Sequence, residues 1–354
     1  MTVADAAREL AHGNELRRAG RLEEAAAAYR RAVELAPANG DAHYNLAIAL
    51  RQAGDLRAAA LEFRTAARAN PRDTDAVQNV VETLALAVEC GERPFVPPAM
   101  PPAAARTPFS IVVCSVDPGR LATMQASFRA ALGDREHEFV VIRDARSLAE
   151  GYQRGARAAR HPLVAFSHDD VEIASRHAFE VLQRALERHA IVGLAGSDRA
   201  SGPAAAWAGH PHLHGTVAYP AGNGFKATVY SLATGTVAGM QVLDGLFFAA
   251  RRDAALAVGF DAQAFDGFHL YDLDFVYRAH LAGHSIGVTT EVLALHASEG
   301  RFDDAWRRYA RVFLRKFPAL DAPQGPSFYF GREFARRDHL VRFHEAFNGL
   351  GAQP

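Results

Sequence analysis

The first 90 residues contain an internal repeat with a period of 34 residues. A fixed period of this length constrains the fold strongly, because each repeat must be one supersecondary unit that buries its apolar face against the next. Matching residue types recur at this spacing: Gly20 and Gly54, Ala25 and Ala59, Tyr29 and Phe63, Ala32 and Ala66, and Pro37 and Pro71. The glycines predict turns between helices, the alanines predict close helix packing, and the prolines predict helix ends.

This pattern resembles the tetratricopeptide repeat, in which each unit is a helix-turn-helix. A further helix is predicted from about Asp73 to Glu89, where apolar residues recur at helical spacing. These residues are Val77, Val80, Val81, Leu84 and Val88. The helix would either cover the open end of the second repeat or dock on the next domain. We therefore expect a helical repeat domain over residues 1–90.

A proline-rich segment, residues 91–108, follows the repeats. It holds six prolines and few charges, which is typical of a stiff, extended linker. The prolines are Pro94, Pro97, Pro98, Pro101, Pro102 and Pro108. We expect the domain boundary here, a second domain over residues 109–320, and a C-terminal helical extension over residues 321–354.

The second domain alternates apolar runs with helical segments. The apolar runs predict strands at 109–116, 139–143, 163–167, 191–195, 243–249 and 286–289. Helices are predicted up to residue 132 and at 148–160, 177–189, 253–258, 271–282, 303–316 and 332–347. Residues 196–242 are too long for an ordinary connection and predict an active-site loop or a hairpin insertion. The alternation indicates a Rossmann-like, largely parallel α/β sheet with helices on both faces.

Charge and cysteine content narrow the class of partner. Lys and Arg total 39, Asp and Glu total 40, and the net charge is -1, so no overall field favours nucleic acid or anionic lipid as a partner. Cys90 and Cys114 provide neither a disulfide framework nor a cysteine zinc site, which favours the cytoplasm. We expect no secretory signal and no integral membrane segment, because no run approaches about 18 apolar residues.

Two acidic clusters are the candidate chemical sites. Ser167-His168-Asp169-Asp170 directly follows an apolar strand, and ligands bind at that edge of open α/β sheets. Adjacent carboxylates there suit Mg²⁺ or Mn²⁺, although a solvated turn that caps the next helix is the alternative. In the second cluster, Tyr271-Asp272-Leu273-Asp274, the two carboxylates do not share one helical face. One could act as a general base while the other caps the helix or pairs with Arg278.

Five motifs stand in an order typical of one enzyme family. They are residues 147–155 (Ser-Leu-Ala-Glu-Gly-Tyr-Gln-Arg-Gly), Phe-Ser-His-Asp-Asp-Val, Leu-Asp-Gly-Leu-Phe-Phe-Ala-Ala-Arg-Arg (243–252), Gly-Phe-Asp (259–261) with Tyr-Asp-Leu-Asp-Phe, and Leu-His-Ala-Ser-Glu-Gly (295–300). The order resembles the GT-A-fold, family-2-like glycosyltransferases, and particularly a bacterial branch with His in the first position of its acidic motif. The resemblance extends from about residue 109 to residue 317.

The resemblance implies a donor site. His168, Asp169 and Asp170 take the place of the family's Asp-x-Asp motif, and Asp170 would bind Mn²⁺ or Mg²⁺ that holds a nucleoside-diphosphate sugar, with a UDP-sugar favoured. His168 replaces the usual first Asp, and a neutral imidazole prefers softer ions and adds no charge. His296 matches a late His that in some relatives completes the metal shell, and a structural role is its alternative.

The same resemblance assigns further roles. Ser115, Asp117 and Asp144 would contact the nucleobase and ribose, although each could be an ordinary loop or capping residue. Asp244 would approach the donor sugar or the acceptor. Asp272 would be the base of an inverting transfer, although Tyr271 stands where the family has Glu.

Residues near the long irregular stretch could bind the acceptor. Trp207 could stack on a sugar face or belong to the core. We also assign Asp274, in the second acidic cluster, to acceptor binding. His210, His212 and His214 alternate and would project from one face of a strand, where they could bind a metal.

The sequence lacks a P-loop, a Gly-x-Gly-x-x-Gly fingerprint after the first strand, and a Gly-x-Ser-x-Gly elbow, which argues against those kinases, dehydrogenases and hydrolases. The favoured hypothesis is an active transferase whose repeats recruit a protein acceptor or partner. One alternative is a non-catalytic repeat scaffold with a degenerate transferase domain. Another is a transferase for glycan or lipid whose repeats form a homodimer.

Overall fold

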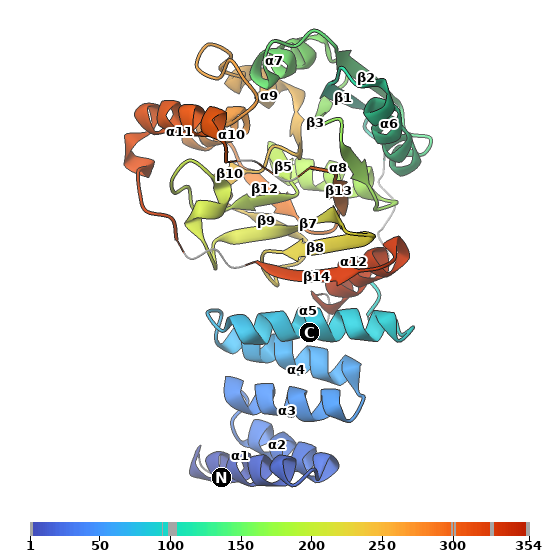
Figure 1. Cartoon of the computed structure of the whole chain (residues 1–354), viewed down its shortest axis with the longest axis vertical. Coiled ribbons are helices and arrows are strands. Elements are labelled where there is room, and N and C mark those ends of the chain that lie inside the picture. The colour runs from blue at the N-terminus through green and yellow to red at the C-terminus, as the bar shows by residue number, and fades with distance from the viewer. Residues whose placement is uncertain are drawn as a thin grey trace. The chain divides into compact units, whose positions relative to one another are not determined.

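The structure is a computed structural model that describes residues 3–93, 95–97, 105–298, 300, 302–325 and 329–351. The chain forms two compact units (Figure 1): Met1–Pro98 together with Phe330–Pro354, and Ala99–Tyr329. Of the predicted linker, Pro94, Pro98, Pro101 and Pro102 lie outside the described residues.

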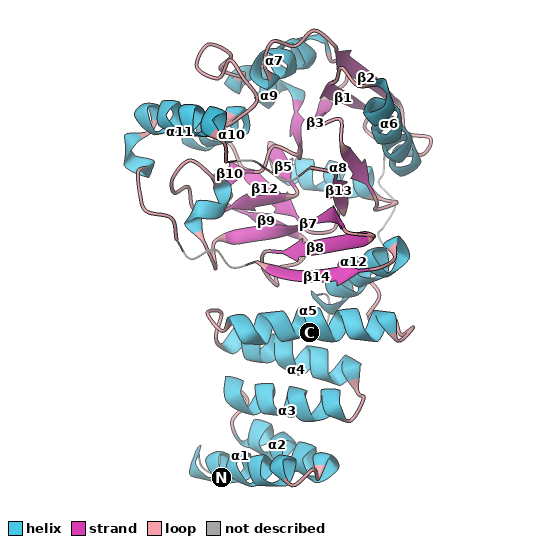
Figure 2. Cartoon of the chain, in the orientation of Figure 1, coloured by secondary structure: helices cyan, strands magenta, loops and turns pink. Residues whose placement is uncertain are grey.

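The first unit contains the predicted helical repeats, and this part of the fold class is confirmed. Its helices are α1 (Val3–Arg18), α2 (Leu22–Leu35), α3 (Gly40–Gln52), α4 (Leu56–Ala69) and α5 (Thr74–Glu89), which stack in succession (Figure 2). Gly20 and Gly54 form the turns inside the two repeats with φ of 74° and 86°, a conformation that glycine adopts without steric cost. Tyr29 and Phe63 are fully buried between the helices.

The C-terminal segment belongs to the same unit. It comprises β14 (Phe330–Phe334) and α12 (Arg337–Gly351), so the helix predicted from residue 332 starts later and follows a short strand. Helix α12 packs on α5, and Arg332 pairs with Glu82 at 3.0 Å and Glu89 at 2.8 Å. These contacts cover a face of α5 that the repeats leave open.

The second unit contains a mixed sheet with the strand order β2-β1-β3-β11-β5-β12-β9. The strands are β1 (Phe109–Cys114), β2 (His137–Ile142), β3 (Leu163–Ser167), β5 (Ile191–Gly193), β9 (Thr236–Ala238), β11 (Phe247–Arg251) and β12 (Ile286–Thr289). Strand β1 is parallel to β2 and β3, and β5 is parallel to β12. Strand β11 is antiparallel to both β3 and β5, so the sheet is less parallel than predicted.

The long irregular stretch supplies most of a second sheet. Its order is β10-β6-β7-β13-β4, with β8 paired to β7 as a hairpin. The elements are β4 (Val171–Ile173), β6 (Ala195–Ser197), a 3₁₀ turn η1 (Ala205–Ala208), β7 (Leu213–Ala221), β8 (Gly224–Val229), β10 (Val242–Leu243) and β13 (Ala294–His296). The runs predicted as single strands at 191–195 and 243–249 each divide between the two sheets.

Helices cover both faces of the main sheet (Figure 1). Helices α6 (Pro118–Leu132) and α8 (Ala178–Arg188) share one core. The core on the other face of the sheet holds α7 (Leu148–Ala158), α9 (Arg252–Val258), α10 (Tyr271–Leu281) and α11 (Asp304–Lys316). A 3₁₀ turn, η2 (Pro318–Leu320), follows α11. Close packing requires Gly155 on α7, because a Cβ there would lie 2.1 Å from a methyl of Val112 on β1.

Among the described residues, no helix is both long and apolar enough to cross a membrane.

Candidate active site

The first acidic cluster lies where β1 and β3 end. Ser115 follows β1 and donates a hydrogen bond from its hydroxyl to Asp169 Oδ2 at 2.7 Å. His168 follows β3, and its backbone N–H donates to the carbonyl of Leu246 at 3.0 Å. The carboxyl ends of adjacent parallel strands therefore place these residues side by side.

Strand β13 brings a third element to this edge. Its last residue, His296, lies with Nε2 3.4 Å from Nδ1 of His168 and 3.3 Å from Oδ1 of Asp170. The backbone N–H of Ala297 donates to the carbonyl of Asp170 at 2.9 Å and holds the two segments together. One ligand atom from each of His168, Asp170 and His296 lies within 4.8 Å of the others.

The protonation states in this cluster suit metal binding. Burial, together with the neighbouring His296, lowers the pKa of His168 to about 4, so its imidazole is neutral at pH 7. Burial alone would raise the pKa of Asp170, but hydrogen bonding to His296 and Ser298 outweighs it and holds that pKa well below its ordinary value. The cluster thus presents an ionised carboxylate beside a neutral imidazole, both of which can donate a lone pair.

The donor set fits a divalent transition metal. Two imidazole nitrogens and one carboxylate oxygen converge from two segments, the β3–β4 connection and the end of β13, and the side chains of Asp170 and His296 are 9% and 10% exposed. Mg²⁺ favours a shell of oxygens, whereas imidazole ligands favour first-row transition metals. Of the two ions predicted from the sequence, this set therefore suits Mn²⁺ better.

Tyr271, which the sequence marked only as a departure from the family pattern, orients His168. Its hydroxyl lies 2.8 Å from Nε2 of His168 and donates to the carbonyl of Gly245 at 3.1 Å. Because that donor proton is used, the hydroxyl accepts the Nε2 proton of a neutral His168. The Nδ1 lone pair then faces His296 and Asp170. A hydrogen bond to the far nitrogen of a ligating histidine fixes its tautomer in this way.

The second acidic cluster lies in the first turn of α10. Leu270, which precedes it, has φ 60° and is the only non-glycine residue with positive φ among those described. Strain of this kind persists only where surrounding contacts enforce it and is common at functional sites. The α10 N-cap position carries no side-chain cap, so Asp272 is not the N-cap residue that an ordinary helix start would provide.

Asp272 has the electrostatics of a general base. Burial and the neighbouring charge of Asp244 raise its pKa to about 7, even though the backbone N–H groups of Leu273 and Gly245 partly offset the rise. A Cβ on Gly245 would lie 2.6 Å from the Asp272 carboxylate and 2.6 Å from the Tyr271 hydroxyl, so this approach requires glycine. A carboxyl group that ionises near pH 7 can take a proton under physiological conditions.

Asp244 lies in the connection between β10 and β11. Its backbone N–H donates to the carbonyl of Ala195 at 2.9 Å, and its Oδ1 accepts from the backbone N–H of Leu246 at 3.0 Å. Asp244 lies close enough to Asp272 to raise its pKa, and its contact with the donor sugar or the acceptor stays a prediction.

Asp274 pairs with Arg278, which is the alternative that the sequence left open for one carboxylate of this cluster. We expected it to contact the acceptor, but its side chain is fully buried and pairs with Arg278 at 2.8 Å and Lys316 at 2.6 Å. Two residues along a helix rotate a side chain to a different face, so α10 directs Asp274 toward α11. Its role is to pair α10 with α11.

Asp117 and Asp144 lie beyond the ends of β1 and β2. Asp117 is the N-cap of α6 and accepts hydrogen bonds from the backbone N–H groups of Gly119 at 2.8 Å and Arg120 at 3.0 Å. Asp144 is 75% exposed and accepts from Arg154 at 2.7 Å. Both residues lie at the sheet edge where nucleotide contacts are expected. Asp117 also caps a helix and Asp144 also bonds a neighbouring arginine, which are the ordinary roles that the sequence left open.

The three alternating histidines do not form a three-ligand metal cluster within the described part of the chain. His212 Nδ1 and His214 Nε2 instead lie 2.8 Å and 3.1 Å from the two oxygens of Asp198. Sequence reasoning missed Asp198 because it follows β6, a neighbouring strand rather than a neighbouring segment of the chain.

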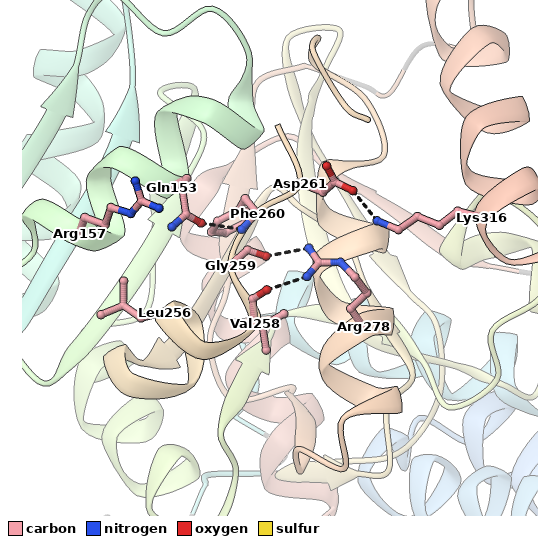
Figure 3. Close-up of a pocket in the computed structure, with 9 residues that line it drawn as sticks. All are labelled: Gln153, Arg157, Leu256, Val258, Gly259, Phe260, Asp261, Arg278 and Lys316. Carbon is pink, nitrogen blue, oxygen red and sulfur yellow. Dashed lines mark hydrogen bonds and ion pairs between the residues drawn. The ribbon is translucent and has the colours of Figure 1, made fainter. Parts of the chain in front are cut away.

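Trp207 lines a cavity of about 610 Å³ in the unit Ala99–Tyr329, which also contains the two acidic clusters. Its ring lies 6.1 Å from that of Trp306, centroid to centroid. A second cavity, of about 370 Å³, contains none of the predicted site residues (Figure 3). Its polar groups largely bond one another: Gln153 accepts from the backbone of Phe260 at 2.6 Å, and Lys316 pairs with Asp261 at 2.6 Å. This second cavity is formed by packed helices and loops.

The fold and the site together define a GT-A-type glycosyltransferase domain joined to helical repeats. Residues 113–317 match the model of a glycosyltransferase-like family, which is more than half of the chain. The chain belongs to that family and is a glycosyltransferase. Residues 10–74 match the tetratricopeptide repeat, in agreement with the 34-residue period.

No curated protein matches the chain. Among solved structures, it is similar to a mutant of the Thermobaculum terrenum O-GlcNAc transferase, at 17% identity and a TM-score of 0.23. The similarity covers 39% of this chain and 37% of that one.

Proposed function

We propose that this enzyme transfers a sugar from a nucleoside-diphosphate sugar to an acceptor hydroxyl, with inversion at the anomeric carbon and Asp272 as the general base. The observation that carries the proposal is the carboxyl group of Asp272, whose pKa burial and Asp244 raise to about 7 in the same site as the His168–Asp170–His296 cluster. A base poised near neutral pH and a cation site for a diphosphate are the two requirements of this reaction.

His168, Asp170 and His296 would hold Mn²⁺. When bound, such an ion neutralises negative charge that builds up on a departing diphosphate. Tyr271 keeps the His168 imidazole in the tautomer that offers Nδ1 to the cluster. Ser115, whose hydroxyl is bonded to Asp169, would contact the ribose and base of the nucleotide together with Asp117 and Asp144.

The chain's own residues supply the proton transfer. Asp272 takes the proton of the acceptor hydroxyl as its oxygen attacks the anomeric carbon. One C–O bond forms to the acceptor, and the C–O bond to the nucleoside diphosphate breaks with its electron pair on the diphosphate. The proton remains on Asp272 until solvent removes it, and Asp244 lies close enough to influence that carboxyl throughout.

The repeats would recruit a protein that carries or contains the acceptor. Their match to the tetratricopeptide family supports a protein-binding role, because stacked repeats present extended surfaces to partners.

Release of nucleoside diphosphate from a panel of sugar nucleotides tests the proposal. The full chain should turn over at least one donor with Mn²⁺ and lose that activity in EDTA. Asp170→Asn should reduce turnover at least tenfold, whereas Asp134→Asn, an 85% exposed carboxylate distant in sequence from every cluster residue, should leave it unchanged. Absence of turnover with every donor, or equal rates for Asp170→Asn and wild type, would reject the proposed function.

A further inference from the structure

The cavity of about 610 Å³ beside the site is walled by aromatic rings from several elements. Trp207 comes from η1, Tyr219 from β7 and Trp306 from α11, while Tyr230 follows β8. The cavity lies within the volume range of small-molecule sites. Its walls present flat apolar faces, on which the C–H faces of sugar rings pack.

The cavity adjoins the reacting centre. The ring of Tyr219 lies 6.1 Å from that of His296, centroid to centroid, so the cluster borders one wall. Tyr230 lines the same cavity, and burial together with the charge of Asp244 raises the pKa of its hydroxyl. A molecule in the cavity would thus extend toward both His296 and Asp244.

The charges of the lining select among ligands. Among the described residues that line the cavity, the charged side chains are those of Lys226 and Arg307, and both are basic. Arg307 pairs with Asp304 at 2.5 Å, and both are strongly exposed. Lys226 is half-buried, has no carboxylate partner among the described residues, and holds its ammonium 5.1 Å from the centre of the Tyr329 ring. A partly desolvated ammonium in an aromatic cavity favours an anionic group on the ligand.

We propose that this cavity is the acceptor subsite and that it takes an anionic saccharide, whose ring stacks on Trp207 and Trp306 and whose carboxylate or phosphate pairs with Lys226. The inference rests on the proposed function, because the cavity takes part in the reaction only if the adjoining His168–Asp170–His296 cluster holds the donor. The enzyme would on this basis extend a sugar that already bears a negative charge.

The sequence provides a direct reporter, because Trp207 and Trp306 are its only two tryptophans. Intrinsic fluorescence of the full chain therefore senses this cavity without any added label. Three methyl glycosides of one sugar serve as probes: the neutral glycoside, its uronate and its 6-phosphate. The uronate and phosphate arms distinguish a carboxylate from a phosphate as the preferred anion.

We expect at least one anionic glycoside to change the fluorescence and to bind at least tenfold more tightly than the neutral one. Lys226→Met should remove that preference, whereas Arg311→Met, which removes an exposed cation from α11 outside the cavity, should preserve it. Far-UV circular dichroism of both variants shows whether they are folded, and the single-tryptophan variant Trp306→Phe shows whether Trp207 alone senses the ligand.

Equal affinity for neutral and anionic glycosides, no fluorescence change with any of them, or an anion preference that survives Lys226→Met would overturn the inference. Release of nucleoside diphosphate is measured in parallel. Donor turnover without anionic binding rejects the subsite and leaves the proposed function, whereas absence of donor turnover rejects the function itself.

Discussion

The pH dependence of transfer follows from the position of Asp272 beside Asp244. Burial and that neighbouring carboxylate raise the pKa of Asp272 from 3.8 to about 7. The base must be ionised to accept a proton, so the rate should fall about tenfold for each pH unit below 7 and level off above it. The Asp272→Asn variant has no base and should lose about 10²- to 10⁴-fold in kcat, with no acidic limb.

Asp244→Asn tests the cause of the raised pKa. After burial, the charge of Asp244 is the largest cause of the raised pKa of Asp272. The fall of kcat at acidic pH should therefore shift to lower pH in Asp244→Asn, while burial still keeps the pKa of Asp272 above the ordinary value for Asp. The matched control is Asp198→Asn, which removes a carboxylate bonded to His212 and His214. The assay is the pH profile of initial rates at saturating donor and Mn²⁺.

The raised pKa of Asp272 also affects folding stability: the ionised form that catalysis needs is the form that destabilises the fold. A carboxyl with a raised pKa in the folded state contributes stability that is full below pH 3.8 and is lost as pH rises to about 7. The ionised carboxylate at pH 8 therefore costs at most about 4 kcal/mol. Asp272→Asn should be more stable than wild type at pH 8 in urea unfolding, while it is far less active.

An acidic limb that persists in Asp272→Asn, or one that does not move in Asp244→Asn, would refute this reasoning. A loss of stability in Asp272→Asn at pH 8 would show that burial does not penalise this carboxylate.

Three further outcomes are expected. Tyr271→Phe, which releases the His168 tautomer, should weaken Mn²⁺ binding about 10- to 100-fold by electron paramagnetic resonance titration, whereas Tyr309→Phe at a site remote in sequence should not. Gly155→Ala should destabilise the chain by about 1 to 3 kcal/mol in urea unfolding, because its Cβ would collide with β1, and an unchanged midpoint would contradict this. A variant without α1–α4 keeps α5 for α12 to pack on; it should lose transfer to a protein acceptor but retain donor hydrolysis, and undiminished transfer to protein would reject the recruitment role.

The repeats could be predicted because their signal is local. A period of 34 residues and paired glycines such as Gly20 and Gly54 determine helix, turn and stacking within each unit. The end of a buried strand was equally readable, so the sequence alone predicts that His168, Asp169 and Asp170 lie at a ligand-binding edge of the sheet.

Strand direction and second-sheet membership could not be predicted. Strand β11 (Phe247–Arg251) is apolar and buried on both faces except at Arg251, and such a run carries no information on whether it lies parallel or antiparallel to its neighbours. The approach of His296 to His168 was implied only by the family resemblance, because it depends on the pairing of β13 with β4, two short strands that were not predicted. The pairing of Asp274 with Arg278 was one of the predicted alternatives, but its second partner, Lys316, lies on a different helix and was not predicted.

In the proposed reaction, the His168–Asp170–His296 cluster binds the cation that holds the donor. The most direct measurement is calorimetric titration of the full chain with a nucleoside diphosphate, with Mn²⁺ and with EDTA, for wild type and His296→Ala. We predict binding that requires Mn²⁺ and weakens at least tenfold in His296→Ala. Equal affinity in EDTA, or undiminished Mn²⁺-dependent binding in His296→Ala, would contradict the claim.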